Sequence, residues 1–394
     1  MVQRGDQREY LGEVFRSALA IVRADRLVES ALAGEDFTHV IALGKAAEAL
    51  TAGAWRVTGG KLETGFLALP RGYATGELPR EARFERHVGA HPLPDESSLA
   101  AGTALLRFAD GLPVNARVAV LVSGGTSASV EAPARGIDLE FLRRASRWLL
   151  ASGLPIADIN RVRAGLSRLK GGGLARRLRR VRAVAWVLSD VADDELEWVG
   201  GGLLAPLPEG AMPALPEWLE GRFAPSPSDN SPDLFLHRLA GNAEAVAAVV
   251  KQGARITGSL DGEATELGRR IGRNLANGER GLFVWGGETT VRLPDNPGRG
   301  GRCQQLALAA AMEMVGRDDC FLLAAATDGW DGTEPVAGAC VDGGTIARGE
   351  AAGCNPRHVL AAADTGPFLE AAGDLVRTGP TGTNVNDLVI ALKR

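Results

Sequence analysis

The segment HVIALGKAAEALTAGAW, residues 39–55, carries the clearest signal of fold class in this chain. The apolar run VIAL predicts a short buried strand, and the residues after Gly44 and Lys45 repeat apolar side chains at helical spacing. A strand that passes through a glycine turn into a helix is the unit from which α/β proteins are built. Ligands of such proteins bind at the carboxyl ends of the strands, so we expect Gly44 and Lys45 at a binding edge.

The same alternation of strand and helix recurs along the chain. RVAVLVSGGTSAS (117–129) predicts a strand entering a glycine loop, DLEFLRRASRWLLASG (138–153) a helix with a glycine stop, and VRAVAWVLSDV (181–191) another buried strand. In the second half, GLFVWGGETTVRL (281–293) predicts two strands about a tight turn, and CFLLAAATDGWDG (320–332) a strand ending in an acidic loop. We therefore expect an α/β protein with a largely parallel sheet.

The length and the prolines predict two domains. At 394 residues the chain exceeds what one core usually holds, since a domain typically takes about 150 residues. Seven of the 20 prolines lie between Pro206 and Pro232, so we interpret residues 206–232 as an excursion that ends at the domain boundary. We expect residues 1–232 to form a Rossmann-like domain, a mostly parallel sheet between helices, and residues 233–394 to form a smaller α/β domain.

Composition excludes several classes of protein. The formal net charge of −4 argues against general binding of nucleic acid. No run of 18 apolar residues occurs, and MVQRGDQREYLGEVFRSAL has charges where a signal peptide is apolar, so we expect a cytoplasmic protein without a membrane partner. The cysteines form no C-x-x-C pair, which favours reduced, mostly buried thiols over zinc or a disulfide. They are Cys303, Cys320, Cys340 and Cys354.

A basic segment runs from Arg161 to Arg182, with nine Lys and Arg residues and no acid. Such a run is usually a solvated helix face. Three glycines at 171–173 interrupt it directly after Lys170, just before a helical stretch. An anion site at this break therefore stays open beside the solvated face.

Familiar catalytic motifs are missing from the sequence. G-x-x-x-x-G-K-[ST], a strand followed by G-x-G-x-x-G, and G-x-S-x-G do not occur, which argues against a P-loop enzyme, a nicotinamide site and a serine hydrolase. The five histidines show no metal-binding spacing. Four other loops follow predicted strands, at 44–45, 123–127, 189–190 and 327–332. They supply backbone N–H groups, a cation and carboxylates, which are the groups that phosphate chemistry needs.

Lys45 and Arg302 each follow a glycine and open a predicted helix. A lysine at the positive end of a helix dipole is unfavourable unless an anion compensates, which favours phosphate binding over an exposed helix start for Lys45. Neither interpretation prevails for Arg302. For Asp328 the alternatives are a metal site, to which Asp331 could contribute, and an ordinary turn. For Asp190, at the end of a buried strand, an N-cap role competes with a site role.

Taken together, these loops resemble one family. Eight pieces occur in that family's order over nearly the whole chain: LGKAAEAL, HPLPDESS, LVSGGTSA, RLKGGGLARRL, LSDV, GGETTVRL with GRGGRCQQLALA, ATDGWDGTEPVAGACVDG, and TGPTGTNVNDLVIAL. The sequence resembles the glycerate 2-kinase family, which has an N-terminal α/β domain and a C-terminal MOFRL domain. The resemblance implies an active site in the cleft between the two domains.

The resemblance implies phosphorylation of D-glycerate by ATP and Mg²⁺ at the 2-hydroxyl, with these small molecules as partners and a homodimer left open. Lys45 and Arg302 would be catalytic and stabilise charge on the transferring oxygens. Asp190 and Asp328 would orient the hydroxyl or hold the metal. Substrate or phosphate binding is expected at Ser123, Gly124, Gly125, Thr126, Ser127, Lys170, Gly300 and Gly301. Nucleotide binding is expected at Gly286, Gly287, Glu288, Thr289, Thr383, Asn384, Asn386 and Asp387.

The chain departs from the family pattern at three places. Thr126 stands at the third glycine of S-G-G-G-S, and the segment 192–205 is shortened. Cys303 and Gln305 stand where the family has asparagine and glutamate. A kinase-fold paralogue acting on another hydroxy acid and a non-catalytic ligand-binding relative are therefore alternatives. An NAD-linked hydroxypyruvate reductase is disfavoured, because the dinucleotide fingerprint is missing.

Overall fold

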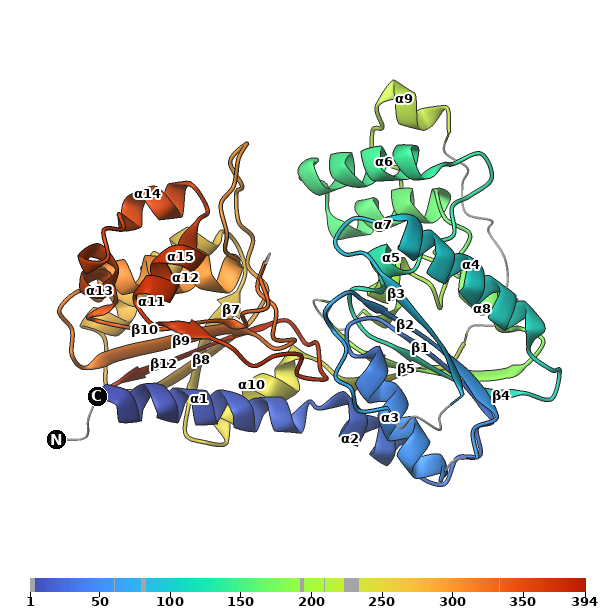
Figure 1. Ribbon diagram of the computed structural model, residues 1–394, viewed down its shortest axis with the longest axis horizontal. Coiled ribbons are helices and arrows are strands. Elements are labelled where there is room, and N and C mark those ends of the chain that lie inside the picture. The colour runs from blue at the N-terminus through green and yellow to red at the C-terminus, as the bar shows by residue number, and fades with distance from the viewer. Residues whose placement is uncertain are drawn as a thin grey trace. The chain divides into compact units, whose positions relative to one another are not determined.

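The computed structural model describes residues 4–59, 61–78, 83–191, 195–208, 210–222, 234–332 and 334–394. The chain divides into two compact units (Figure 1). The N-terminal unit is Ala24–Ala240, and the C-terminal unit joins Gly241–Arg394 to the residues up to Arg23. A two-domain α/β layout, predicted from the length and the strand pattern, is thus confirmed.

The N-terminal unit is built on six parallel strands. They are β1 (His39–Leu43), β2 (Thr64–Pro70), β3 (Phe84–Gly89), β4 (Arg117–Val122), β5 (Arg182–Leu188) and β6 (Leu236–Ala240). Their order is β3-β2-β1-β4-β5-β6, which is the strand order of a Rossmann fold and confirms the predicted Rossmann-like domain. The order reverses between β1 and β4, so the carboxyl ends of these two strands form the ligand-binding edge that such sheets offer.

Helices cover both faces of this sheet, with α2 and α3 on one side and α4 and α8 on the other (Figure 1). The helices are α2 (Ala24–Ala31), α3 (Ala47–Thr58), α4 (Glu96–Gly111), α5 (Thr126–Ser129), α6 (Leu139–Ala151), α7 (Ile156–Gly165), α8 (Gly173–Leu178) and α9 (Glu217–Glu220), with the 3-10 helix η2 (Leu196–Gly201). Local sequence sets where α4 begins, because Asp95 accepts hydrogen bonds from the backbone N–H groups of Ser97 and Ser98 while the Ser98 hydroxyl accepts one from Asp95 N–H.

The helices α6, α7 and α9 form a small core of their own. Leu142, Leu149, Val162 and Leu219 are among its buried members. Leu219 comes from the proline-rich excursion at 206–232, so the described part of that excursion, 206–208 and 210–222, packs within the N-terminal unit. Residues 209 and 223–232 lie outside the described residues, as does the predicted boundary at 232/233.

The C-terminal unit carries a second six-stranded sheet, in the order β11-β10-β9-β12-β8-β7. Its strands are β7 (Arg255–Leu260), β8 (Gly281–Gly287), β9 (Cys320–Ala326), β10 (Gly338–Asp342), β11 (Leu375–Val376) and β12 (Asp387–Lys393). Only β7 and β8 pair in parallel, and the other pairs are antiparallel. The largely parallel sheet predicted from the sequence therefore occurs in the N-terminal unit alone. The C-terminal strand lies between β9 and β8 and stays in this unit.

The prediction of two strands about a tight turn at 281–293 is wrong, because β8 is the only strand that forms in that segment. β8 already has β12 on one side and β7 on the other, so no side is left for its own continuation. Gly287 also has a φ of 134°, where a side chain would be strained, and the chain leaves the sheet there. Thr290 retains a single bridge to Glu263.

The N-terminal helix belongs to the C-terminal unit, which differs from the predicted division. This helix, α1 (Arg4–Ile21), buries Leu11, Val14 and Phe15 and contacts β9, β12 and α10 (Asn242–Val250). Arg8 Nη1 lies 2.7 Å from Oδ1 of the fully buried Asp374. The sequence shows that α1 has an apolar face but does not show which sheet covers it, so its place at the start of the chain did not predict its unit.

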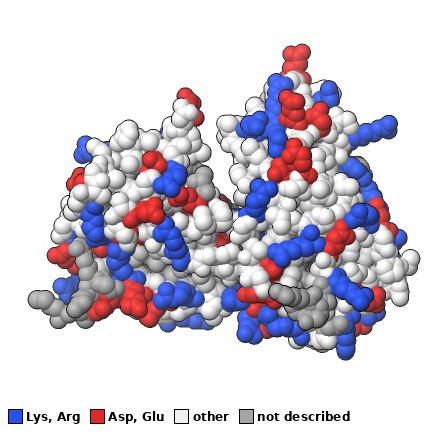
Figure 2. All heavy atoms as spheres, in the orientation of Figure 1, with Lys and Arg blue, Asp and Glu red and all other residues white. Residues whose placement is uncertain are grey.

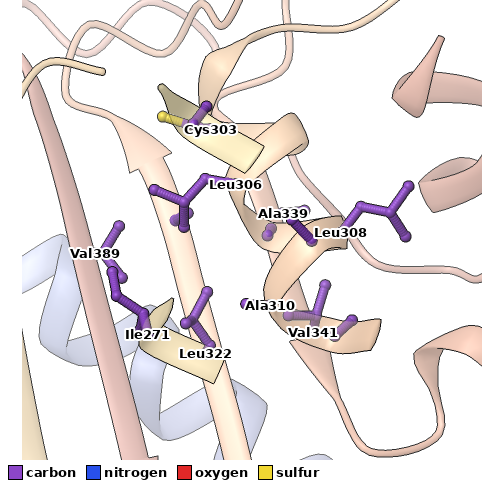
Figure 3. Packing of buried hydrophobic residues seen from close by; sticks show 14 of the residues in the cluster. Ile271, Cys303, Leu306, Leu308, Ala310, Leu322, Ala339, Val341 and Val389 are labelled. Carbon is purple, nitrogen blue, oxygen red and sulfur yellow. The ribbon is translucent and has the colours of Figure 1, made fainter. Parts of the chain in front are cut away.

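The core of the C-terminal unit lies between its sheet and two helices, α11 (Ala264–Asn277) and α12 (Arg302–Glu313). Figure 3 shows Leu306 of α12 near Leu322 of β9 and Val389 of β12, with Ile271 of α11 closing the cluster. The smaller helices α13 (Thr345–Ala351), α14 (Pro356–Ala361) and α15 (Thr365–Ala371) pack around α12. This core fixes the start of α12, where Arg302 lies.

The surface and the thiols agree with a globular chain of mixed charge. Figure 2 shows Lys and Arg side chains interspersed with Asp and Glu on the face that it draws. None of the helices within the described residues is long and apolar enough to cross a membrane. All four cysteines are free, and Cys303, Cys320 and Cys340 are buried, as predicted.

Candidate active site

The backbone around Lys45 is fixed by the neighbouring strand of the sheet. β1 and β4 lie side by side, and their two following loops are joined by hydrogen bonds from Lys45 N to Gly124 O (2.9 Å) and from Ala46 N to Ser123 Oγ (3.0 Å). Gly44 has a φ of 103°, and a Cβ there would overlap the carbonyl oxygen of Ser123. Only glycine allows this approach, which places Lys45 at the binding edge predicted from the sequence.

The Lys45 side chain lies in a slot between a glycine and an aromatic ring. Its Cγ would be 2.9 Å from a Cβ at Gly125, and its Nζ is 5.4 Å from the centroid of the buried Tyr73 ring, within cation–π range. The loop that carries Tyr73 is held by the buried Glu48, which accepts hydrogen bonds from Thr75 N (2.6 Å) and Gly76 N (3.2 Å). Tyr73 and Glu48 were missed at the sequence level, because nothing local links either residue to Lys45.

The loop 123–127 follows β4 and accommodates its departure from the family pattern. Thr126 is fully buried and donates its hydroxyl hydrogen bond to Ser123 O (2.8 Å), which closes the turn at the start of α5. The one left-handed residue of this turn is Gly125, whose φ of 83° favours glycine. The Cβ of Thr126 therefore adds no backbone strain at the third position, and Ser127 stays half-buried beside it.

Lys170 is buried and paired with a carboxylate of its own unit. It is 1% exposed, and its ammonium forms an ion pair with the buried Glu131. Burial lowers its pKa, and Glu131 opposes that shift. The Glu131 carboxylate also accepts a hydrogen bond from Ser167 Oγ (2.5 Å). Substrate binding by Lys170 stays a prediction. Its partner Glu131 lies 39 residues earlier in the chain, so local sequence analysis could not find this pair.

Asp190 lies at the same edge of the sheet as Lys45. It follows β5, which pairs with β4 in parallel, so the loops after β1, β4 and β5 all lie at the carboxyl ends of adjacent strands. Its neighbour Ser189 donates its backbone N–H to Ala240 O (2.9 Å), which fixes the end of β5. Residues 192–194, part of the shortened segment, lie outside the described residues.

In the C-terminal unit, Arg302 is the first residue of α12, and the start of that helix is capped from a distance. Gly301 at the N-cap has no side chain to offer. Asp331 supplies the cap, accepting hydrogen bonds from Cys303 N (3.0 Å) and Gln304 N (2.9 Å). A Cβ at Gly301 would overlap the Asp331 carboxylate, so the glycine admits the cap. Asp331 therefore caps this helix.

Two carboxylates hold the Arg302 guanidinium. Asp387 accepts from Nε (2.5 Å) and Nη2 (3.1 Å), and Glu288 Oε1 lies 2.6 Å from Nη1. Burial lowers the pKa of Arg302, but Asp387 and Glu288 outweigh it and raise that pKa well above its usual value. Burial, with Asp387 nearby, raises the pKa of the Asp331 carboxyl to about 6. Arg302 is thus a permanent cation among three carboxylates.

The residues predicted to bind nucleotide do come together, because β8 and β12 are paired and Asp387 lies opposite Gly287. Two of them, Glu288 and Asp387, bind Arg302. Thr289, Thr383 and Asn384 are buried, and Asn386 has a positive φ of 63°. This segment is joined to the loop after β9, where the Thr327 hydroxyl accepts from Val385 N (2.9 Å) and donates to Asn386 O (2.6 Å).

The two predicted metal ligands belong to different units. Asp328 is buried after β9, where its carboxylate accepts a hydrogen bond from Trp330 N (2.9 Å), whereas Asp190 follows β5 in the N-terminal unit. Within the described residues, His, Cys, Asp and Glu form no group of three or more that could hold a metal ion. The assignment of Asp190 and Asp328 as metal ligands stays a prediction.

Gly300, which is predicted to bind phosphate, lies beside Thr365. A Cβ at Gly300 would come within 2.5 Å of the threonine hydroxyl.

Fold and site together define a two-unit α/β protein. Each unit has a cation directly after a glycine: Lys45 lies in the turn before α3, and Arg302 is the first residue of α12. A family model described as a domain of unknown function, DUF4147, matches residues 10–216, and the MOFRL family model matches residues 281–387. The chain is 35% identical to the D-glycerate 2-kinase of Thermotoga maritima, over 96% of this chain and 97% of that protein.

Structural similarity extends over the same length. A crystal structure of a glycerate kinase from Thermotoga maritima matches with a TM-score of 0.80 and 31% identity, covering 99% of this chain and 100% of that chain. A further relative, from Agrobacterium vitis, is provisionally named a hydroxypyruvate reductase and is 34% identical over 79% of this chain and 78% of its own length. This chain belongs to the glycerate 2-kinase family.

Proposed function

We propose that this chain transfers the γ-phosphoryl group of ATP to the 2-hydroxyl of D-glycerate, giving 2-phosphoglycerate and ADP. The observation that carries the proposal is the placement of Lys45 and Arg302. Each follows a glycine at or just before a helix start and is held by contacts with its own unit. The chain also matches a D-glycerate 2-kinase over nearly its whole length.

Lys45 and Arg302 would stabilise charge on the oxygens of the transferring phosphoryl group. In phosphoryl transfer the protein contributes mainly positioning and electrostatic stabilisation, and fixed cations supply both. Lys45 comes from the N-terminal unit and Arg302 from the C-terminal unit, so turnover would need residues of both units.

Mg²⁺ would enter as the metal of the nucleotide substrate. Mg²⁺ is commonly held by one or two carboxylates together with substrate phosphates and water, so it does not need a cluster of protein ligands. Asp190 and Asp328, each at the end of a buried strand, fit that requirement or could orient the glycerate hydroxyl. The loop 123–127, with its glycine turn at Gly125, would receive the glycerate carboxylate or a phosphate.

A reductase is a weaker candidate for the same fold. The N-terminal unit has the Rossmann strand order, but its first β–α turn reads Gly44-Lys45-Ala46 and lacks the three glycines that admit a dinucleotide pyrophosphate. The Lys45 ammonium at that turn would instead stabilise negative charge on a phosphoryl group during its transfer. Incubation with hydroxypyruvate and NADH or NADPH should therefore leave the nicotinamide absorbance unchanged.

The test is ADP release from MgATP across a panel of small hydroxy acids. D-glycerate should be the preferred substrate, with L-glycerate, D-lactate and glycolate far slower. Preference for another acid in the panel would make this chain a paralogue of the glycerate 2-kinases. ATP binding without ADP release for any acid would make it a non-catalytic relative and would refute the proposed activity.

A further inference from the structure

The two carboxylates on Arg302 differ sharply in their surroundings. The Asp387 side chain is 1% exposed, whereas the Glu288 side chain is 47% exposed. Asp387 accepts hydrogen bonds from Nε and Nη2, and Glu288 Oε1 forms an ion pair with Nη1. One guanidinium is thus held on one edge from inside the protein and on the other edge from the solvent side.

We propose that Asp387 is a positioning residue that fixes the plane of the Arg302 guanidinium, and that Glu288 is an exchangeable counter-ion that leaves Nη1 when a phosphate binds. The inference rests on the proposed function, since it takes Arg302 as the phosphate-binding cation. It differs from the prediction that both carboxylates contact the nucleotide themselves.

The backbone of Asp387 is held on both sides, which suits a fixed role. As the first residue of β12 it pairs with Gly287 of β8 and with Ala326 of β9. Its carbonyl oxygen also accepts a hydrogen bond from Asn242 Nδ2 (3.1 Å). A bidentate contact from so rigid a residue sets both the position and the tilt of the guanidinium. Separating this pair would leave a buried charge unpaired, so we expect it to persist through catalysis.

Glu288 lies where the chain leaves the sheet, and water competes for its half-exposed carboxylate. A guanidinium has five N–H donors, of which Asp387 accepts from two, while Glu288 forms an ion pair at Nη1. A phosphate would bind most strongly at the edge that includes Nη1. Its negative charge would also repel Glu288, so the carboxylate and the phosphate compete for the same donor.

The first experiment measures the affinity for inorganic phosphate by isothermal titration calorimetry, which requires no turnover. Glu288→Gln should lower the dissociation constant about threefold or more, because a neutral amide competes less well than a carboxylate. Glu279→Gln is the matched control: Glu279 is 83% exposed and pairs with Arg255 (2.9 Å) in the same unit. It changes the net charge equally and should leave phosphate affinity as it is in the wild type.

If Glu288→Gln bound phosphate no more tightly than the wild type, Glu288 would not be an exchangeable counter-ion. An equal gain in phosphate affinity in Glu279→Gln would also refute that role. In an Arg302→Ala background, Glu288→Gln should have no effect, because the shared donor is gone. The calorimetric result stands whether or not D-glycerate is the substrate, so failure of the proposed function would appear separately, as a wild type that binds phosphate but releases no ADP with D-glycerate.

The second experiment tests Asp387 by steady-state kinetics with the substrate identified in the panel. Asp387→Asn should lower kcat about 100-fold with KM for ATP changed less than about threefold, because orientation matters most in the transition state. Asp387→Glu keeps the charge but shifts it by one methylene, and should also lose kcat. Wild-type kcat in either folded variant, or a loss confined to KM, would refute the positioning role.

Discussion

At the scale of single residues, the cations of the candidate site are fixed before any ligand arrives. Lys45 is held by Gly124 at its backbone and by the Tyr73 ring at its ammonium, and Arg302 is held by Asp387. The sequence predicted where these two residues lie, because a glycine before a helix start is a local pattern. It could not predict their partners, since Asp387 is 85 residues from Arg302.

Substitution of either cation should abolish turnover but should affect stability differently. Lys45→Ala should leave the free energy of unfolding within about 0.5 kcal/mol of the wild type, because Lys45 is only partly buried. Arg302→Ala should lower it by about 2 kcal/mol, because it leaves Asp387 buried without its cation. ADP release and urea unfolding measure the two effects. Retention of most activity in either variant would remove that residue from the site.

Asp331 makes stability depend on pH in a direction opposite to that of most paired carboxylates. Its pKa is about 6 in the folded chain against an ordinary value of 3.8, so the folded state binds this proton more tightly than the unfolded state. By linkage, its contribution to stability is greatest below about pH 4 and is lost as the pH rises towards about 6. Once it is ionised, the loss amounts to about 3 kcal/mol.

The comparison with Asp331→Asn isolates this effect, because asparagine does not titrate. The stability of the wild type relative to Asp331→Asn should fall by about 2 kcal/mol between pH 4.5 and pH 7.5. Urea unfolding of both proteins at the two pH values is the measurement. A difference that stays constant, or that grows with pH, would contradict the raised pKa of Asp331.

At the scale of elements, glycine and alanine set how closely α11 and α12 pack. A Cβ at Gly268 of α11 would overlap the carbonyl oxygen of Leu306 on α12, and a Cβ at Gly272 would lie 2.5 Å from Ala310 O. The run LALAAA of α12 is small enough to permit the approach. These contacts hold α12, and with it Arg302, against α11.

Gly268→Ala should therefore destabilise the protein by about 2 kcal/mol, because the methyl group meets backbone that cannot move aside. Gly12→Ala, within α1 of the same unit, is the matched control. Its Cβ would approach only the flexible end of Arg16, at 3.3 Å, and alanine should stabilise that helix by about 0.5–1 kcal/mol. Thermal unfolding compares the two. Equal effects would mean that close helix packing is not the cause.

Secondary structure was predictable where one element sufficed to specify it. The strand and helix of residues 39–55 and the helix after Asp138 formed as expected, since their apolar spacing and caps are local. The predicted hairpin at 281–293 failed because pairing depends on which strands are available. β8 is already paired with β7 and β12, one of which comes from the end of the chain.

At the scale of the whole molecule, the order of the chain does not follow the order of its units. α1 opens the sequence but packs on the C-terminal sheet, where Arg8 reaches a buried cluster formed by Asp342, Asp374 and Arg348. A division into 1–232 and 233–394 was the natural expectation from length and prolines. Which sheet covers the apolar face of α1 depends on tertiary packing that periodicity does not encode.

Arg8→Ala should therefore loosen the C-terminal unit and leave the N-terminal unit unchanged. Loss of the 2.7 Å contact with Asp374 removes one of two cations from a fully buried carboxylate, at a cost of about 1–2 kcal/mol. Hydrogen exchange followed by mass spectrometry should show faster exchange in α1, β9 and β10 and wild-type exchange in β1 and β4. Faster exchange in β1 and β4, or none in β9 and β10, would contradict this assignment of α1.

The proposed activity is tested most directly by ³¹P NMR of the purified protein with Mg²⁺, ATP and D-glycerate, because one spectrum reports both turnover and the position phosphorylated. We predict the resonance of 2-phosphoglycerate, rising as ADP appears, and its loss in Lys45→Ala. The resonance of 3-phosphoglycerate alone would contradict the proposed 2-hydroxyl, and intact ATP with no phosphoglycerate would contradict glycerate kinase activity itself.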